Sequence, residues 1–516
     1  MRSYRLPVRR LLSGCSLMVA VAVGSAAPAE AGLLSSTVGL VDSTLGIVTS
    51  GWDDGATTAP VSLSTVADAV GADELWKRGI DGTGIDVAVI DTGIAPVAGL
   101  DGAGKVVNGP DLSFESQAAE YRHFDTFGHG THMASIVAGH DSAGFKGLAP
   151  GARIVNIKVG NYQGAVDVTQ VIAAIDWVVQ HRNDSGLNVR VLSLAYGTDG
   201  LQSYQLDPLT HAVESAWRNG IVVVASGGND GTSRAALTNP AYDPRVLAVG
   251  ASDLKGTVSA LDDTVAAFSS RGNSSRRVDL VAPGVSVLGL RNPGSTIDDA
   301  HPDAVVNERF FRGSGTSQAA AVTAGSVALL LQARPSLSPD MVKALLRTTA
   351  TPLVKGDLAG QGSGRLNIEA AALAAVPTTT SVTVAPSTGT GSLEAARGTS
   401  HVASDGIELT GERDIMGNPW NGSAWAPTST AGTAWTAGTW NGAEWAGTCW
   451  CGESWTATTW EGKSWTGKSW TGKSWTADEW SGKSWTGKSW TGKSWTGKSW
   501  TGKSWTGKSW TSATSS

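Results

Sequence analysis

A glycine-rich turn followed by a helix places a serine where nucleophilic chemistry is favoured. Residues 313–325 read Gly-Ser-Gly-Thr-Ser-Gln-Ala-Ala-Ala-Val-Thr-Ala-Gly, and the helical pattern continues to Arg334, just before Pro335. Ser317 therefore lies in the first turn, near unpaired backbone N–H groups and the positive end of the helix dipole. That environment suits a serine whose attack on a carbonyl creates an oxyanion. The alternative is that Ser317 or Thr316 only caps the helix.

Three polar residues upstream have the types that an activated serine requires. Such a serine needs a base, an acid that orients the base, and a hydrogen-bond donor for the oxyanion. Asp91 directly follows the apolar run 85–90, His129 lies between two glycines at a helix start, and Asn229 follows the apolar run 221–225. Open α/β sheets build their sites at the carboxyl ends of their strands. We therefore expect these side chains to meet there, although Asp91 could also be a simple turn residue.

The elements that position these residues alternate between strands and helices. Strands apolar on both faces, alternating with amphipathic helices, indicate a mostly parallel sheet covered by helices. The predicted fold class is therefore α/β. Strands are expected at 85–90, 154–159, 189–196, 221–225, 246–251 and 278–287, and helices at 168–181, 208–219, 317–334 and 339–348, with helical alanines continuing to residue 375.

Four short segments resemble the signatures of the subtilisin-like serine peptidases. They are Val89-Ile90-Asp91-Thr92-Gly93, His129-Gly130-Thr131-His132, Ser226-Gly227-Gly228-Asn229 and Gly315-Thr316-Ser317, in the chain order Asp, His, Ser. Residues 191–197, 268–272 and 281–284 also match in type and order. The resemblance covers roughly residues 67–375. It implies a three-layer sandwich around a mostly parallel sheet, and hydrolysis of peptide bonds.

The resemblance also implies a role for each polar residue. Ser317 would be the nucleophile, His129 the general base, and Asp91 the residue that orients His129. Asn229 would donate to the oxyanion together with the backbone N–H of Ser317. His132 is a rival base, but the first histidine of the signature is the catalytic one in the family. We expect His132 to pack one turn further along the same helix.

Other family features are expected or depart from the pattern. Ala321 stands where the family usually has proline, and residues 140–146 are shorter than the loop that often binds calcium. No cofactor is required for the chemistry, and a structural calcium has no support in the sequence. The substrate strand departs from the common residue types at two positions. The expected substrate-binding residues are Ala195, Tyr196, Gly197 and Gly227.

The N-terminus predicts export. Four arginines precede an apolar stretch from Leu11 to Ala27, and Ala29-Glu30-Ala31 is a suitable cleavage site. A membrane anchor is the alternative, but the stretch is short and interrupted by glycine and serine. We therefore predict a signal peptide at 1–31, a leader or short pro-segment at 32–66, the peptidase domain at 67–375, and a secreted or cell-surface protein without a transmembrane anchor.

The C-terminal region differs sharply in composition. Residues 376–415 are rich in Thr, Ser, Gly and Pro, which predicts a flexible linker. Within residues 416–516, Trp recurs every five residues from Trp420 to Trp510 except at Thr430. We expect short extended pieces joined by turns, or no fixed fold. Cys449 and Cys451 are either bonded, to each other or to another chain, or free.

Charge separates the tail from the body. The whole chain has a net charge of −6. From Glu461 onward nine lysines oppose three acidic residues, a net charge of +6, so the preceding residues carry −12. An acidic body argues against binding nucleic acid. Exposed tryptophans and lysines would suit a cell-wall polymer, although the near-identical repeats could also be a functionless low-complexity tail or contact lipid.

The predicted function is therefore an exported serine endopeptidase that acts on proteins or peptides with a broad, mildly apolar preference. The alternative is a catalytically inactive surface protein that binds through its tail. An inactive relative would be expected to have lost at least one of Asp91, His129, Asn229 and Ser317. All four are present, which favours the enzyme.

Overall fold

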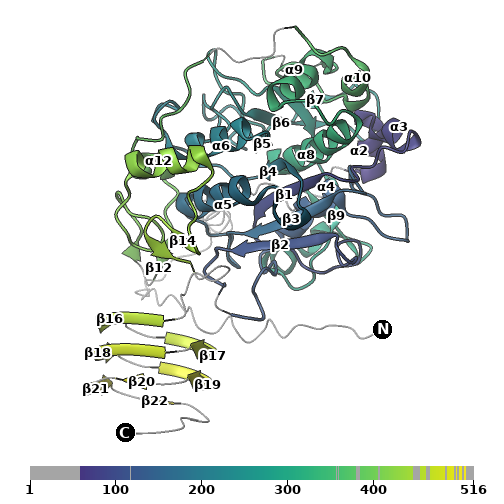
Figure 1. Cartoon of the computed structure of the whole chain (residues 1–516). Coiled ribbons are helices and arrows are strands. Elements are labelled where there is room, and N and C mark those ends of the chain that lie inside the picture. Colours follow the sequence, from purple (N-terminus) through teal and green to yellow (C-terminus); the bar gives the residue numbers. More distant parts are fainter. Residues whose placement is uncertain are drawn as a thin grey trace, which may run out of the picture. The chain divides into compact units, whose positions relative to one another are not determined.

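Apolar strands pair into a parallel sheet at the centre of the computed structural model (Figure 1). The structure describes residues 59–445 apart from 117, 201, 356, 358, 379–383 and 405–406, together with strand segments between residues 454 and 506. The chain divides into two units, one formed by Ala29–Ala443 and one by Met1–Pro28 with Glu444–Ser516. The predicted signal peptide, Cys449 and Cys451 lie outside the described residues.

The main sheet has the strand order β2-β3-β1-β4-β5-β6-β7, and β8 pairs with β6. Among the described strand pairs of this sheet, β6–β7 is antiparallel and the others are parallel. Every residue of β1 and β5 is buried, as expected for strands covered on both faces. The strands are β1 (Asp86–Asp91), β2 (Val106–Asp111), β3 (Arg153–Lys158), β4 (Val189–Leu194), β5 (Val222–Ser226), β6 (Leu247–Asp253), β7 (Thr264–Val265) and β8 (Leu280–Pro283).

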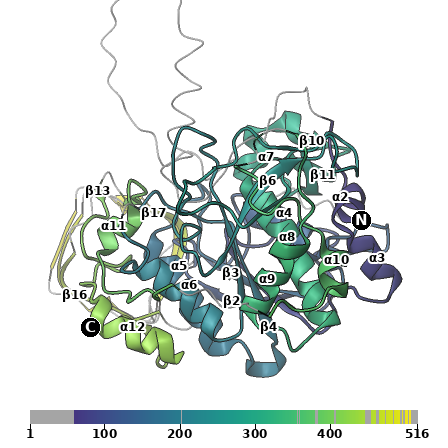
Figure 2. The same cartoon turned by 90° about the horizontal axis from the view of Figure 1, so that it is seen from above.

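Helices cover both faces of this sheet (Figures 1 and 2). On one face lie α5 (Val168–His181) and α6 (Pro208–Arg218). On the other lie α4 (His129–Ala138) and the central α8 (Thr316–Ala333), with α9 (Pro339–Thr349) and α10 (Ile368–Leu373). The α/β, three-layer arrangement predicted from the sequence is confirmed. Ala321 lies inside α8, which continues without interruption.

The smaller elements surround this core. A three-stranded sheet of β9 (Val287–Leu290), β10 (Val305–Val306) and β11 (Phe310–Gly313) packs near α4. Two differences from the expected elements occur here. β2 was not predicted, and the run 278–287 contains β8 and ends on the first residue of the separate strand β9. The remaining short helices are α2 (Leu63–Val70), α3 (Ala72–Lys77), η3 (Asp184–Gly186), α7 (Thr296–Ala300) and η4 (Pro302–Ala304).

The folded body includes residues that precede the predicted domain start at residue 67. Val61 pairs with Val287, and its backbone N–H donates to the carbonyl oxygen of Ser286 at 2.8 Å. The side chain of Ser62 caps α2 by accepting from the backbone N–H of Thr65. The last residues of the predicted leader are therefore part of the folded body.

Residues 384–443, which we call the collar, also belong to the folded body. The sequence predicts a flexible linker over 376–415, but the structure places α11 (Leu393–Arg397) there, with Arg397 fully buried in an ion pair to Asp167. The linker prediction missed this packing because small polar residues surround the few anchoring side chains. The other collar elements are β12 (Ala403–Ser404), β13 (Ile407–Glu408), α12 (Gly422–Ala431), β14 (Thr439–Trp440) and the start of β15 (Ala443–Glu444).

The first tryptophans of the repeat are core residues of this body. Trp420, Trp425, Trp435 and Trp440 are each less than 10% exposed. The indole N–H groups of Trp425 and Trp440 donate to Oδ2 of Asp176 on α5, at 2.7 and 2.9 Å. α12 packs beside α6 (Figure 1). The start of the predicted tail is therefore packed against the sandwich.

Later repeats form strands within the second unit. β16, β18, β20 and β21 make one sheet and β17, β19 and β22 another, with parallel pairing. Trp455 pairs with Trp475, and Trp465 pairs with Trp485, so equivalent repeat positions are aligned. These strands are β16 (Ser454–Trp460), β17 (Trp465–Gly472), β18 (Ser474–Gly482), β19 (Trp485–Gly492), β20 (Trp495–Thr496), β21 (Ser499–Gly502) and β22 (Trp505–Thr506).

Among the described residues, no helix combines the length and hydropathy needed to cross a membrane.

Candidate active site

Asp91 and His129 are in direct contact at the carboxyl edge of the sheet. Asp91 is the last residue of β1, and His129 is the first residue of α4. The imidazole Nδ1 lies 2.8 Å from Oδ1 and 2.9 Å from Oδ2 of Asp91. Both side chains are almost fully buried, with exposed fractions of 1% and 3%. A carboxylate at Nδ1 keeps the ring proton on that nitrogen, which makes Nε2 the basic nitrogen.

Thr92 and Asp125 fix this pair in place. The backbone N–H of Thr92 donates to Asp91 Oδ1 at 2.8 Å, and its hydroxyl donates to Asp125 Oδ1 at 2.8 Å. Asp125 also accepts from the backbone N–H groups of Phe127, Gly128 and Thr131. It therefore provides acceptors for N–H groups at the start of α4 that have no partner within the helix. Burial raises the pKa of Asp125, and these hydrogen bonds oppose that rise.

Two glycines allow His129 to approach the sheet. Gly128 has a φ of +113°, a conformation that L side chains rarely adopt. A Cβ atom on Gly130 would lie 2.2 Å from the carbonyl oxygen of Gly93, so a side chain there would push α4 away from β1. The glycines on both sides of the histidine are therefore required by the close packing of the site.

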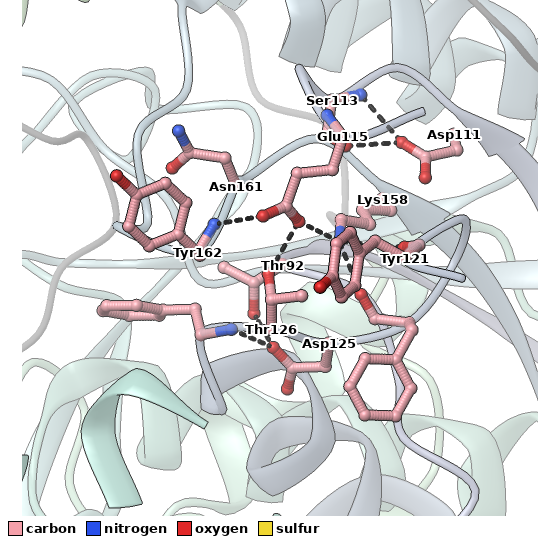
Figure 3. A network of polar contacts seen from close by, with 12 residues as sticks. Thr92, Asp111, Ser113, Glu115, Tyr121, Asp125, Thr126, Lys158, Asn161 and Tyr162 are labelled. Carbon is pink, nitrogen blue, oxygen red and sulfur yellow. Dashed lines mark hydrogen bonds and ion pairs between the residues drawn. The ribbon is translucent and has the colours of Figure 1, made fainter. Parts of the chain in front are cut away.

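A second polar network supports the loop that leads to His129 (Figure 3). Lys158 lies on β3, the strand beside β1, and is the register partner of Asp91. Its fully buried ammonium group donates to Glu115 Oε2 at 2.6 Å and to the carbonyl oxygens of Tyr121 and Phe124. Glu115 also accepts from the hydroxyl of Thr126 at 2.6 Å. Lys158 thus ties the loop between β2 and α4 to the sheet edge beside Asp91.

Asn229 is attached to the residue that precedes Ser317. The backbone N–H and the hydroxyl of Thr316 both lie 2.9 Å from Oδ1 of Asn229. A backbone N–H can only donate, so the amide oxygen faces Thr316 and the NH₂ group faces the other way. A Cβ atom on Gly315 would lie 3.4 Å from Asn229 Nδ2 and 3.6 Å from the backbone nitrogen of Ser317. The two donors expected for an oxyanion therefore flank one point.

The start of α8 is held by neighbouring loops. The backbone N–H of Gly315 donates to the carbonyl oxygen of Gly284 at 2.8 Å, and that of Gly228 donates to the hydroxyl of Thr316 at 3.2 Å. Ser317 is the second residue of this helix and is buried. α8 also packs closely on α4, because a Cβ atom on Gly325 would lie 2.8 Å from the carbonyl oxygen of Val137.

His132 faces a different part of the molecule. It lies in α4, as expected, and its Nε2 is 3.0 Å from the carbonyl oxygen of Phe311 in β11. Burial lowers the pKa of His132 to about 3. A histidine that stays neutral in this way, bonded to a backbone carbonyl, has a structural role.

The expected substrate-binding residues lie at the ends of β4 and β5. Ala195 and Tyr196 follow β4 and are 3% and 2% exposed. Gly197 is backed by Thr238, because a Cβ atom on Gly197 would lie 2.7 Å from the Cβ atom of Thr238. A Cβ atom on Gly227 would lie 2.9 Å from a methyl group of Val278. These four residues therefore have fixed backbones at the same sheet edge as Asp91.

The residues described contain no group of three His, Cys, Asp or Glu side chains that could hold a metal ion. In the short segment 140–146, Oδ1 of Asp141 accepts from the backbone N–H groups of Ala143 and Phe145. Its other oxygen is paired with Arg309. Both carboxylate oxygens of Asp141 are therefore engaged by other groups of the chain.

Three residues that support the site, Thr92, Asp125 and Lys158, had no role in the sequence-based prediction, and Thr316 was considered only as a helix cap. Thr92 and Thr316 stand inside the quoted signatures. Asp125 was recognisable as an acidic residue just before a helix start. Lys158 had no signal beyond being a single charge at the end of an apolar strand.

Comparisons with known proteins find peptidases of one family. Residues 82–365 match the subtilase family of peptidases, peptidase S8. The serine protease AprX of Bacillus subtilis is 38% identical over 60% of this chain and 71% of its own length. Subtilisin DY of Bacillus licheniformis is 36% identical over 61% of this chain and its full length. Fervidolysin of Fervidobacterium pennivorans, described as a keratinolytic enzyme related to subtilisin, superposes with a TM-score of 0.50 at 31% identity, over 60% of this chain and 45% of its own.

Proposed function

The chain belongs to the subtilase family and is a subtilisin-like serine endopeptidase, and on that premise we propose that Asp91, His129 and Ser317 are its catalytic residues. The observation that carries the proposal is the contact of His129 Nδ1 with both carboxylate oxygens of Asp91. The fixed amide of Asn229 beside the backbone nitrogen of Ser317 supports it independently.

The proposed reaction proceeds through an acyl-enzyme. Ser317 Oγ attacks the scissile carbonyl while His129 Nε2 takes the hydroxyl proton, and the imidazolium is stabilised by Asp91. Asn229 Nδ2 and the backbone N–H of Ser317 donate to the oxyanion. His129 then gives the proton to the leaving amine, and water repeats the sequence to release the acid. The substrate lies along Ala195, Tyr196 and Gly197, with Gly227 on the opposite side, and the preference for substrate side chains is broad and mildly apolar.

Labelling of Ser317 tests this assignment. A fluorophosphonate probe should label the secreted, folded chain and fail to label Ser317→Ala. Thr323→Ala is a matched control, because Thr323 lies in the same helix and its hydroxyl donates to the carbonyl oxygen of Ala319, within that helix. Absence of labelling in a folded wild-type chain would instead favour the catalytically inactive surface protein.

For the rest of the chain we propose export through residues 1–31 and binding of cell-wall polymers through the later repeats. Two observations support this role. The chain from Glu461 onward is basic, and neighbouring strands of the later repeats pair at equivalent repeat positions. Protein with the Ser317→Ala change should sediment with purified cell wall at low salt, and the same protein ending after residue 453 should not. Equal sedimentation of both would remove the adhesion proposal.

A further inference from the structure

The loop that follows β4 is covered by a segment of the collar. Residues 195–197, where substrate is proposed to lie, lead directly into this loop. The hydroxyl of Thr198 donates to the carbonyl oxygen of Ala396 at 2.5 Å. Asp199 accepts from the backbone N–H of Thr399 at 2.6 Å and from its hydroxyl at 2.7 Å. These contacts join the end of the substrate strand to residues beyond the family match, which stops at residue 365.

The two segments fit without spare room. A Cβ atom on Gly200 would lie 2.8 Å from the carbonyl oxygen of Ala395 and 3.0 Å from that of Ala396. A Cβ atom on Gly398 would lie 2.8 Å from the backbone nitrogen of Gly200. Further along, Gln202 donates to the carbonyl oxygen of Ser392 at 2.6 Å and accepts from its N–H at 3.0 Å. The loop therefore cannot shift outward while the collar is in place.

Arg397 anchors the collar segment to the sandwich. Its guanidinium donates to Asp167 Oδ2 at 2.6 Å, and neither side chain is exposed. The same group also donates to the carbonyl oxygen of Gly411 at 2.7 Å. Asp167 is the N-cap of α5 and forms a capping box with Gln170. The collar is thus fixed to a rigid helix end, which makes it a firm support for the loop.

The loop in turn contacts residues 238–239, in the connection between Asn229 and β6. The backbones of Thr198 and Asn239 exchange two hydrogen bonds, of 3.0 and 2.9 Å. The side chain of Thr238 packs against both the segment 195–197 and the segment 227–228. Added Cβ atoms on Gly197 and Gly228 would lie 2.7 and 2.8 Å from it. A movement of Thr198 would therefore reach both proposed substrate-binding segments.

We propose that collar residues 391–400 are a positioning element for substrate binding, acting through Thr198 and Asp199 on the strand 195–197. The inference rests on the proposed function of that strand. Its consequence is that the enzyme requires residues well beyond the family domain to bind an extended peptide. The chemical step at Ser317 does not depend on these contacts.

The test separates substrate binding from chemistry. Thr198→Val removes the bond to Ala396, and Asp199→Ala removes both bonds to Thr399. Each should raise KM for an extended tetrapeptide amide about tenfold, the effect of losing one or two ordinary hydrogen bonds. The value of kcat should stay within about twofold. KM for a single-residue ester, which does not reach along the strand, should not change.

Two controls separate positioning from general weakening of the fold. Thr198→Ser keeps the hydroxyl and should keep the wild-type KM. Ser429→Ala removes a collar hydrogen bond to Asp176 far from the loop, so it should lower stability and leave KM unchanged. An unchanged peptide KM in Thr198→Val and Asp199→Ala, with normal fluorophosphonate labelling, would overturn this inference alone. Absence of labelling in the wild-type chain would overturn the proposed function and this inference with it.

Discussion

Replacing Asp176 by asparagine should stabilise the protein at alkaline pH. Asp176 is a buried carboxyl on α5 that accepts hydrogen bonds from the uncharged side chains of Trp425, Trp440 and Ser429. Burial raises its pKa from 3.8 to about 6, although the three hydrogen bonds oppose the rise. Asparagine can keep all three contacts, because its oxygen accepts from both indoles and its NH₂ group donates to the serine hydroxyl.

The sign and size of the stability change follow from the pKa of Asp176 in the folded and in the unfolded state. Because the folded-state pKa is the higher one, the carboxyl is ionised in both states above about pH 6, and there it opposes folding by about 3 kcal/mol. This cost falls as the pH drops from about 6 to about 4, since the folded state then binds a proton that the unfolded state lacks. Asp176→Asn should therefore gain up to about 3 kcal/mol at pH 8 but only about 1 kcal/mol at pH 4.5.

Urea unfolding followed by tryptophan fluorescence would measure this difference, in a Ser317→Ala background that prevents self-digestion. Asp176→Ala is the control. It leaves three buried donors without an acceptor and should lose at least about 2 kcal/mol at both pH values. If Asp176→Asn lost as much stability at pH 8 as Asp176→Ala, the negative charge itself would hold the indoles, and the reasoning from burial would be wrong.

Three further predictions concern the active site. Asp91→Asn should lower kcat of peptide hydrolysis about 10⁴-fold, because the ring proton of His129 would no longer be held on Nδ1. A kcat within tenfold of the wild-type value would contradict the triad. Asn229→Ala should lower kcat about 10²- to 10³-fold with little change in KM, and a change in KM alone would argue against oxyanion binding. Lys158→Met should cost about 3 kcal/mol in urea unfolding by leaving Glu115 unpaired, and adding Glu115→Gln should recover part of that loss.

The helices and central strands were predictable because their signals are local. α5 begins and ends at the residues expected, since its apolar face repeats regularly and Asp167 caps its start. β2 was missed because Val106–Asp111 includes Asn, Gly and Pro, so its pattern is not that of a buried strand. The run 278–287 was read as one strand because its apolar residues continue across Gly284, where the chain turns toward α8.

The collar could not be predicted because its partners are distant in the sequence. Trp425 and Trp440 look like the other repeat tryptophans, and what distinguishes them is Asp176 on the buried side of α5. A carboxylate inside an otherwise apolar helix face was the available signal. Thr430, the position where the repeat lacks tryptophan, lies on α12 with its hydroxyl 3.1 Å from His211 Nε2. That exception marked a packed segment within an apparently uniform tail.

The buried pair of Asp167 and Arg397 sets an order of events during biosynthesis. The two residues are 230 positions apart, and Arg397 lies beyond Ser317 in the chain. With Asp91, His129 and Ser317 as the proposed catalytic residues, a chain synthesised from its N-terminus contains all three before Arg397 is added. The contacts that hold Thr198 and Asp199 need residues 396–399, so they form only after that point. On the proposed roles, a chain that has reached Ser317 but not Arg397 carries its nucleophile without the support of its peptide-binding strand, and full activity toward extended peptides would await the collar.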